Sequence, residues 1–350
     1  MTIMNANPGS MQSRRHDPIT LEILSNALRS AMDEAFVALM KSAHSTNIKE
    51  RKDCSVALFD PAGRLIAQGT QIPLHLGSLN GGVEAVLAAF GGAIAPGDVY
   101  ICNDPYLARG SHLPDINLIT PVFAAGELIG FAANIGHHAD VGGAVPGSIA
   151  GGSRSIFEEG IRIPVARIVR AGEIQTDLLR VICSNTRDPE ERELDLRVQI
   201  ATNERGAEAF RALAARSGVP ALRQSIDDVI AYTQRRVANR VALLKAGEYT
   251  FTDWLDDDGM GGEPVAIRVT LAVQDGRLRF DFSGSGPQAR GAMNVPKSAL
   301  DACVYYAVKA LLDPQVAPNA GLFALIDIVA PPGTIVSPRP PAAVGARSIT

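Results

Sequence analysis

The sequence predicts an α+β protein in which hairpins build mixed, largely antiparallel sheets against long packed helices. The prediction rests on two observations: strand-like runs come in pairs around short turns, and long helical segments stand apart from them. This mixture argues against a doubly wound parallel sheet. With 350 residues, 46% of them hydrophobic and 20% charged, the chain can bury a sizeable core in more than one packed unit.

The first predicted element is a long amphipathic helix that begins near Pro18. Leu24, Leu28, Met32 and Phe36 recur at helical spacing, and proline suits a first helical turn. Residues 1–16, which precede this helix, have no such pattern, so we expect a disordered tail.

Period-two runs around turn sequences predict three hairpins. They comprise residues 55–68 around the turn DPAG, residues 116–137 around Ala124-Ala125-Gly126, and residues 265–284 around Asp275-Gly276, which fits a type I′ turn. Between the first two hairpins we expect a helix over 77–92 and a strand over 98–102, and two long helices fill 189–218 and 220–247.

These elements divide the chain into four predicted parts. We expect a tail (1–16), an N-terminal metal-site α+β domain (17–185), a helical segment (186–247) and a hairpin-containing region (248–350). The chain stops after a Pro-rich stretch with no closing helix, so we expect the last region to be truncated and the sequence to be the front part of a longer protein.

Charge and cysteine usage exclude several classes of protein. A net charge of -4 with both signs interspersed gives no basic stripe for nucleic acid. The absence of a long apolar stretch near the start argues against a signal peptide or membrane association, so we expect a cytoplasmic protein. The four cysteines are far apart, with no CxxC pair, and we expect them to be buried free thiols.

Histidines and carboxylates supply the best candidates for chemistry. His112 and Asp115 stand three apart in a loop closed by proline, and the hairpin that follows returns the chain to this place at His137. Two imidazoles and a carboxylate suit Zn²⁺, Mn²⁺ or Fe²⁺, with positions left for water or substrate. The alternative is that these residues are loop caps that only donate and accept hydrogen bonds.

Further candidates surround this set. Asp53, at a strand entrance, is either a fourth ligand or a solvated turn residue, and His75 is either a core histidine or a polar group lining a cleft. We take His75 and three other residues as candidates for catalytic roles, although each also has a structural interpretation. The other three are His138, Asp140 and Glu159.

Common nucleotide and hydrolase signatures are absent. The chain has no Gly-x-x-x-x-Gly-Lys-Ser/Thr loop, no Gly-x-Ser-x-Gly elbow and no His-Glu-x-x-His helix. Any ATP must therefore be bound by an unfamiliar motif or by another subunit.

From about residue 17 to the end, an ordered series of segments resembles the hydantoinase B/5-oxoprolinase family, which includes the α-type subunits of acetone and acetophenone carboxylases. The segments are DCSVALFDPAGRLIAQ, IPLHLGSLNGGV, PGDVYICNDPY, SHLPDINLITPVF, GHHADVGGAVPGS, EEGIRIP and DFSGSGPQARGAMNVP. The resemblance implies a hetero-oligomer in which a hydantoinase A-type partner binds ATP and phosphorylates the substrate carbonyl. It also implies that this chain holds a divalent metal through His112, Asp115 and His137, with Asp53 as a further ligand.

Three functions are compatible with this resemblance. The first is an ATP-dependent hydrolase of cyclic amides such as hydantoin or 5-oxoproline, the second an ATP-dependent ketone carboxylase, and the third a scaffold subunit stabilised by its metal. The loop before His112 departs from the family's usual Gly-Gly-Thr pattern, because it reads LARGS, and Arg109 there is expected to alter the choice of substrate.

Overall fold

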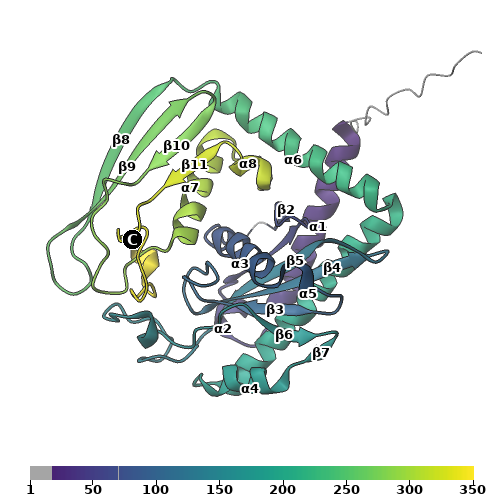
Figure 1. The fold of residues 1–350 in the computed structure, drawn as a ribbon, viewed down its shortest axis with the longest axis horizontal. Helices are drawn as coiled ribbons and strands as arrows, with labels where there is room; N and C mark the ends of the chain where they lie inside the picture. Colours follow the sequence, from purple (N-terminus) through teal and green to yellow (C-terminus); the bar gives the residue numbers. More distant parts are fainter. Residues whose placement is uncertain (1–17, 70) are drawn as a thin grey trace, which may run out of the picture.

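The computed structural model describes residues 18–69 and 71–350, so the predicted tail of residues 1–16 lies outside the described part of the chain. The predicted α+β class is confirmed, since two sheets pack with separate helices (Figure 1). The α-helices are α1 (Pro18–Ser42), α2 (Thr46–Lys49), α3 (His75–Phe90), α4 (Thr176–Ser184), α5 (Pro189–Ser217), α6 (Val219–Val241), α7 (Lys297–Leu312) and α8 (Ala320–Phe323). The strands are β1 (Cys54–Phe59), β2 (Leu65–Gln68), β3 (Val99–Cys102), β4 (Asp115–Ala124), β5 (Glu127–His137), β6 (Ala166–Arg170), β7 (Glu173–Ile174), β8 (Gly247–Leu255), β9 (Val265–Gln274), β10 (Arg277–Asp281) and β11 (Ile326–Val329).

The larger sheet has seven antiparallel strands in the order β2-β1-β5-β4-β3-β6-β7. Helices α1 and α5 cover one face and α3 the other (Figure 1). Because both faces are covered, every side chain of β1 is buried, and its sequence CSVALF reads as an almost unbroken apolar run. Val56 and Leu58 face α1, whereas Ala57 and Phe59 face α3.

The smaller sheet has four strands in the order β11-β10-β9-β8, with only the β10–β11 pair parallel. Asp275 and Gly276 both have positive φ angles, 52° and 71°, as the predicted type I′ turn between β9 and β10 requires. Helix α7 packs between this sheet and α3, and α6 crosses from the larger sheet to β8 (Figure 1).

The three predicted hairpins are confirmed, as are the helix that begins at Pro18 and the two long helices in the middle of the chain. Several elements are not predicted by the sequence patterns above. They are α2, α4, α7, α8, β6, β7, β8 and β11. Strand β8 lacks a buried face, because all nine of its residues are exposed or half-buried. The polar-apolar alternation that identifies a strand is therefore weak there.

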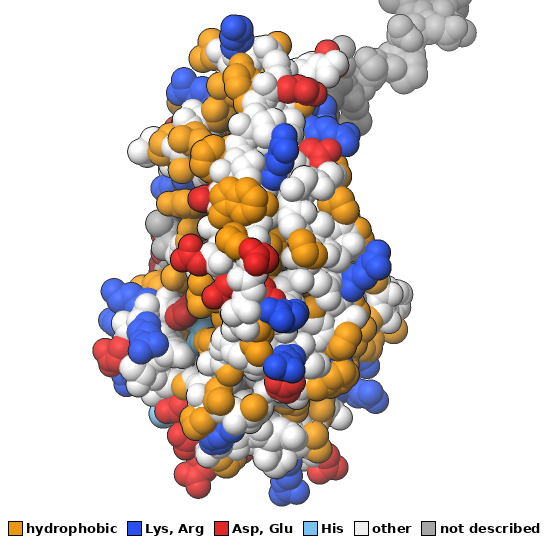
Figure 2. Space-filling view, turned by 90° about the vertical axis from the view of Figure 1, so that its left-hand side faces the viewer, with side chains coloured by type: hydrophobic (Ala, Val, Ile, Leu, Met, Phe, Trp, Pro, Cys, Tyr) orange, Lys and Arg blue, Asp and Glu red, His pale blue; other side chains and the backbone are white. Residues whose placement is uncertain are grey.

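The expectation of four buried thiols is wrong for Cys303. Cys54, Cys102 and Cys183 are buried, but Cys303, on α7, is exposed. Side chains of both charges are interspersed with hydrophobic ones on the side of the molecule where β8 and β9 lie (Figure 2). Within residues 18–69 and 71–350, no helix combines the length and apolarity that crossing a membrane needs.

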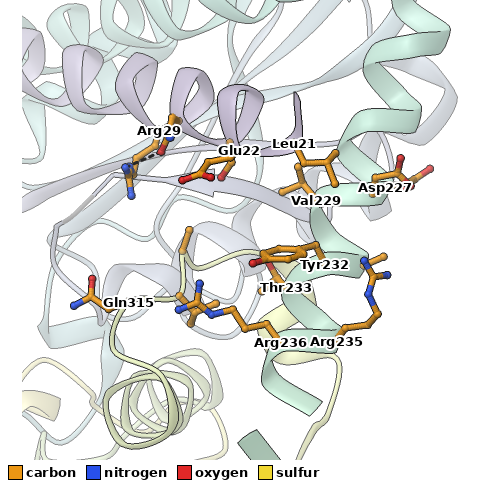
Figure 3. A pocket seen from close by; sticks show the side chains of 16 residues that line it. Leu21, Glu22, Arg29, Asp227, Val229, Tyr232, Thr233, Arg235, Arg236 and Gln315 are labelled. Atoms are coloured by element: carbon orange, nitrogen blue, oxygen red, sulfur yellow. Dashed lines mark hydrogen bonds between the residues drawn. The ribbon is translucent and has the colours of Figure 1, made fainter. Parts of the chain in front are cut away.

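A cavity of about 600 Å³ lies between α1, α6 and the loop after α7. Figure 3 shows Glu22 and Arg29 on one side of it, Tyr232 and Arg236 on the other, and Gln315 at its edge. None of the histidines discussed above lines this cavity. The candidate site is therefore not in it but at one end of the larger sheet.

Candidate metal centre

Three neighbouring strands bring the candidate residues to one edge of the larger sheet. Strand β5 lies between β1 and β4 and is antiparallel to both, so the end of β5 lies beside the start of each neighbour. Asp115 pairs directly with His137, and Cys54 pairs with Gly136. The His137 N–H also donates to the Asp53 carbonyl at 2.9 Å, which fixes the residue before β1 against the end of β5.

His112, Asp115 and His137 converge as the hairpin predicts. Their candidate ligand atoms all lie within 4.8 Å of one another. His112 Nε2 is 3.2 Å from both His137 Nδ1 and Asp115 Oδ1, and His137 Nδ1 is 3.1 Å from the same carboxylate oxygen. The expectation that these three groups share one small volume is confirmed, and among the described residues they form the one set of this kind.

The tautomer of His112 is fixed by its other ring nitrogen. Nδ1 is 3.1 Å from the carbonyl oxygen of Gly345, which can only accept, so Nδ1 carries the proton and Nε2 presents its lone pair to the cluster. Burial, together with the Arg347 charge, lowers the pKa of His112 to about 4. The ring is therefore neutral at pH 7, which is the form that binds a metal.

Asp115 is fully buried and its two oxygens have different surroundings. Oδ1 faces the two imidazoles, whereas Oδ2 accepts from Arg347 at 2.7 Å and from the hydroxyl of Ser111. Burial alone would raise the pKa of the carboxyl, but His112 and Arg347 outweigh it and hold the pKa well below its usual value. Asp115 therefore offers an ionised oxygen to the cluster.

Asp53 and His75 flank this set. Asp53 Oδ2 is 3.6 Å from His137 Nδ1, and its Oδ1 is 3.3 Å from His75 Nε2. Burial opposes ionisation of Asp53, but the hydrogen bond with His75 and the charge interactions with His75 and His137 together outweigh it and lower the pKa of the carboxyl. The second nitrogen of His75 bonds to Ser55 at 2.9 Å, so His75 is a buried ring that orients Asp53 at the edge of the cluster.

His138 lies outside the cluster, as expected if consecutive residues of an extended chain face opposite ways. Its ring is fully buried toward α5, where Nε2 is 2.9 Å from Gln199 Oε1 and Nδ1 is 3.1 Å from an Arg192 nitrogen. Burial and the Arg192 charge lower the pKa of His138 to about 4. Gln199 also donates to the Ile116 carbonyl and to Asn134, so this network attaches α5 to β4 and β5.

Asp140 and Glu159 are also apart from the three converging groups. Asp140 accepts from the N–H groups of Gly142 and Gly147 and pairs with Arg187 at 2.8 Å, contacts that order the loop after β5. Glu159 accepts from two N–H groups near the end of the chain. Neither carboxylate bonds to the cluster directly.

Arg109 has a backbone φ of 54°, the left-handed region that favours glycine. Its guanidinium pairs with Glu84 of α3 and lies 3.9 Å from Asp301 of α7. The side chain thus joins two helices beside the loop that carries His112.

Two contributors to the site are not predicted from the sequence. Arg347 and Gly345 lie 232 and 233 residues beyond the groups they contact, Asp115 and His112. A lone arginine in the stretch PPAAVGARSI carries no local signal, because only the tertiary fold brings it to the sheet edge.

The donor set fits a divalent cation. Two nitrogen donors and one carboxylate oxygen converge, and one histidine has its remote nitrogen held by a backbone carbonyl, the arrangement by which proteins orient metal-binding imidazoles. Without a cation, the lone pair of His112 Nε2 and the charge of Asp115 Oδ1 point into the same volume. Asp53, with a side chain that is 32% exposed, supplies a further oxygen on the solvent side.

The family model for hydantoinase B/oxoprolinase matches residues 17–350, which is nearly the whole chain. The chain belongs to this family. The resemblance stated from the sequence segments is therefore confirmed, and the candidate centre is a feature of a hydantoinase B-type chain.

Curated relatives of this hydantoinase B-type chain are longer than it is. An uncharacterized protein of Methanocaldococcus jannaschii is 34% identical over 95% of the chain, which spans 59% of that relative. A 5-oxoprolinase of Dictyostelium discoideum is also 34% identical over 95% of the chain, which spans 27% of that protein.

Two solved structures share the fold. The ATP-dependent caprolactamase from Pseudomonas jessenii matches 94% of this chain and 57% of its own with a TM-score of 0.87 and 30% identity. A nucleotide-free acetone carboxylase matches 95% of this chain and 46% of its own with a TM-score of 0.87 and 22% identity, a likeness in fold.

Proposed function

We propose that this chain is the metal-binding part of an ATP-dependent hydrolase of cyclic amides. The observation that carries the proposal is the convergence of His112, Asp115 and His137, whose candidate ligand atoms lie within 4.8 Å of one another. The names of relatives support the substrate class, because they include several 5-oxoprolinases and a caprolactamase subunit beta. We propose Zn²⁺, Mn²⁺ or Fe²⁺ as the ion.

We further propose that ATP is bound by a hydantoinase A-type partner in a hetero-oligomer. The sequence has no phosphate-binding loop, which supports this division. The partner would phosphorylate the amide oxygen and so create a good leaving group. This chain would then complete ring opening.

The residues of the centre would act by orienting the atoms that bind the metal and by keeping the Asp115 carboxylate negatively charged. A bound divalent cation lowers the pKa of water and stabilises negative charge on a carbonyl oxygen. The lone pair of His112 Nε2 stays directed inward because the proton on Nδ1 is donated to the Gly345 carbonyl. Arg347 keeps Asp115 ionised. Asp53 and His137 are the least buried members of the set, with side chains 32% and 13% exposed, so substrate would approach from their side.

The other residues expected to act in catalysis take supporting roles in this proposal. His75 orients Asp53, while His138 and Asp140 hold the segments on either side of the end of β5.

The test is reconstitution of the full-length protein with an A-type partner. With ATP, the complex is expected to open 5-oxoproline, hydantoin or caprolactam and to release phosphate in proportion. Carboxylation of a ketone with bicarbonate and no lactam opening would replace the proposal with the carboxylase alternative. Full lactam turnover by a His112→Ala complex would favour the scaffold alternative.

A further inference from the structure

The segment of residues 342–347, here named the C-terminal strap, is buried along its whole length and crosses behind the metal centre. Each part of it is held by a hydrogen bond from elsewhere in the fold. Tyr106 donates to the Ala342 carbonyl at 2.6 Å, Asn294 donates to the Ala343 carbonyl at 2.9 Å, and the Ala346 N–H donates to Ala292 at 3.0 Å.

Glu159 holds the middle of the strap with a single oxygen. Its Oε1 accepts from the N–H of Val344 at 2.9 Å and from the N–H of Gly345 at 2.6 Å. A Cβ added to Gly345 would lie 2.9 Å from that oxygen, so only glycine allows so close an approach. Glu159 is 1% exposed, and its second oxygen, Oε2, is buried with no hydrogen-bond partner.

The strap contacts two of the three proposed ligands directly. The carbonyl of Gly345, the residue that donates to Glu159, accepts from His112 Nδ1 at 3.1 Å. Two residues later, Arg347 donates to Asp115 Oδ2 at 2.7 Å. A displacement of the strap would therefore remove two contacts together: the hydrogen bond that fixes the tautomer of His112 and the ion pair that holds Asp115 Oδ2.

We propose that Glu159 is a positioning residue for the metal centre, which it serves by seating the strap so that Gly345 and Arg347 orient His112 and Asp115. This inference rests on the proposed function, because it assumes that those two side chains hold a cation. It assigns Glu159 a role at a distance from the reacting atoms, in place of the catalytic role considered from the sequence. Glu159 and His112 thus act through one residue, Gly345.

The surroundings of Glu159 support a positioning role. A carboxylate at such depth is unfavourable unless it accepts hydrogen bonds, and burial raises the pKa of Glu159 to about 7. Its acceptor oxygen is directed to the strap, whereas no described side chain donates to the other. The contact of Glu159 with the strap therefore depends on a single acceptor oxygen, Oε1.

The test measures affinity for Mn²⁺ or Zn²⁺, each alone, by calorimetry on the purified chain without partner or ATP. Glu159→Leu removes the acceptor and is expected to raise the Kd by about 10- to 100-fold, the usual effect of losing a group that orients a ligand. Glu159→Gln keeps an acceptor oxygen and is expected to remain within about threefold of the parent on the same scale. If the leucine variant fails to fold, Glu159→Asp, whose carboxylate falls one methylene short, is expected to weaken binding in the same direction.

Asp98 provides a matched control. It is 1% exposed and accepts from the N–H groups of Ala95 and Ala171, but it lies at the far end of β3 from the metal centre. Asp98→Leu should lower thermal stability while leaving the Kd unchanged. If the role of Glu159 were purely structural, Glu159→Leu would likewise lower thermal stability and leave the Kd for the metal unchanged. An unchanged Kd in Glu159→Leu therefore overturns the proposal.

The ring nitrogens of His112 give a second readout that needs no metal. In protein labelled with ¹⁵N-histidine, the parent chain should show the Nδ1-protonated form at His112, and Glu159→Leu should show a mixture of tautomers. If His112→Ala binds metal as the parent does, the proposed centre itself is wrong. If His112→Ala loses the metal while Glu159→Leu keeps both metal and tautomer, only the positioning role is wrong.

Discussion

Replacing Asp115 with asparagine should destabilise the metal-free protein by about 3 to 5 kcal/mol. The reason is Arg347, which is 7% exposed and pairs with Asp115 Oδ2 at 2.7 Å. Among the described residues, no other carboxylate lies within 4.0 Å of this guanidinium. Asparagine keeps the shape of the side chain but removes its charge, so the variant leaves a cation buried without a counterion.

The measurement is urea unfolding followed by circular dichroism in the presence of a chelator, for Asp115→Asn, Arg347→Met and the double variant. In the Arg347→Met background the loss caused by Asp115→Asn should fall to less than half, because no buried cation remains. A loss below about 1 kcal/mol in the parent background, or an equal loss in both backgrounds, would refute this account of the pair.

Three other predictions concern turnover, nucleotide and pH. His137→Ala should abolish product formation and lower metal content in the reconstituted complex while partner-dependent ATP hydrolysis persists at least in part; a variant that retains its metal and normal turnover would exclude His137 as a ligand. The isolated chain should show no appreciable ATP binding or hydrolysis, and tight binding in calorimetry without partner would contradict this. The pKa of His138 is lowered to about 4 in the folded chain from an ordinary 6.5, so as the pH falls the unfolded chain is protonated at this histidine before the folded chain is. The stability contributed by the neutral His138 ring is therefore complete above pH 6.5 and is lost as the pH falls toward 4. Relative to His138→Gln, the parent should lose on the order of 3 kcal/mol over that range in pH-dependent urea unfolding, and parallel pH profiles would contradict this.

The geometry of the centre was predictable where it depends on one hairpin. Strands β4 and β5 are adjacent in sequence, so a turn at Ala125 and Gly126 is enough to bring Asp115 beside His137. The place of Asp53 depends instead on the pairing of β1 with β5, whose paired residues lie 72 to 82 positions apart in the sequence.

The remaining parts of the site depend on tertiary structure that no local pattern encodes. His75 reaches the cluster because α3 begins at the sheet edge, and Arg347 reaches it because the C-terminal strap crosses behind it. The same limit applies to the fold. A buried strand such as β1 is visible as an apolar run, whereas the exposed edge strand β8 has no buried face to give it a pattern.

The central claim is that His112, Asp115 and His137 hold one divalent cation, and the most direct measurement is anomalous X-ray scattering from crystals grown with Mn²⁺ or Zn²⁺. The account predicts one strong anomalous peak at about 2.0 to 2.3 Å from His112 Nε2, Asp115 Oδ1 and His137 Nδ1. Crystals of His112→Ala should show that peak weakened or lost. A fully occupied ion elsewhere in the chain, with no peak between these three side chains, would contradict the claim.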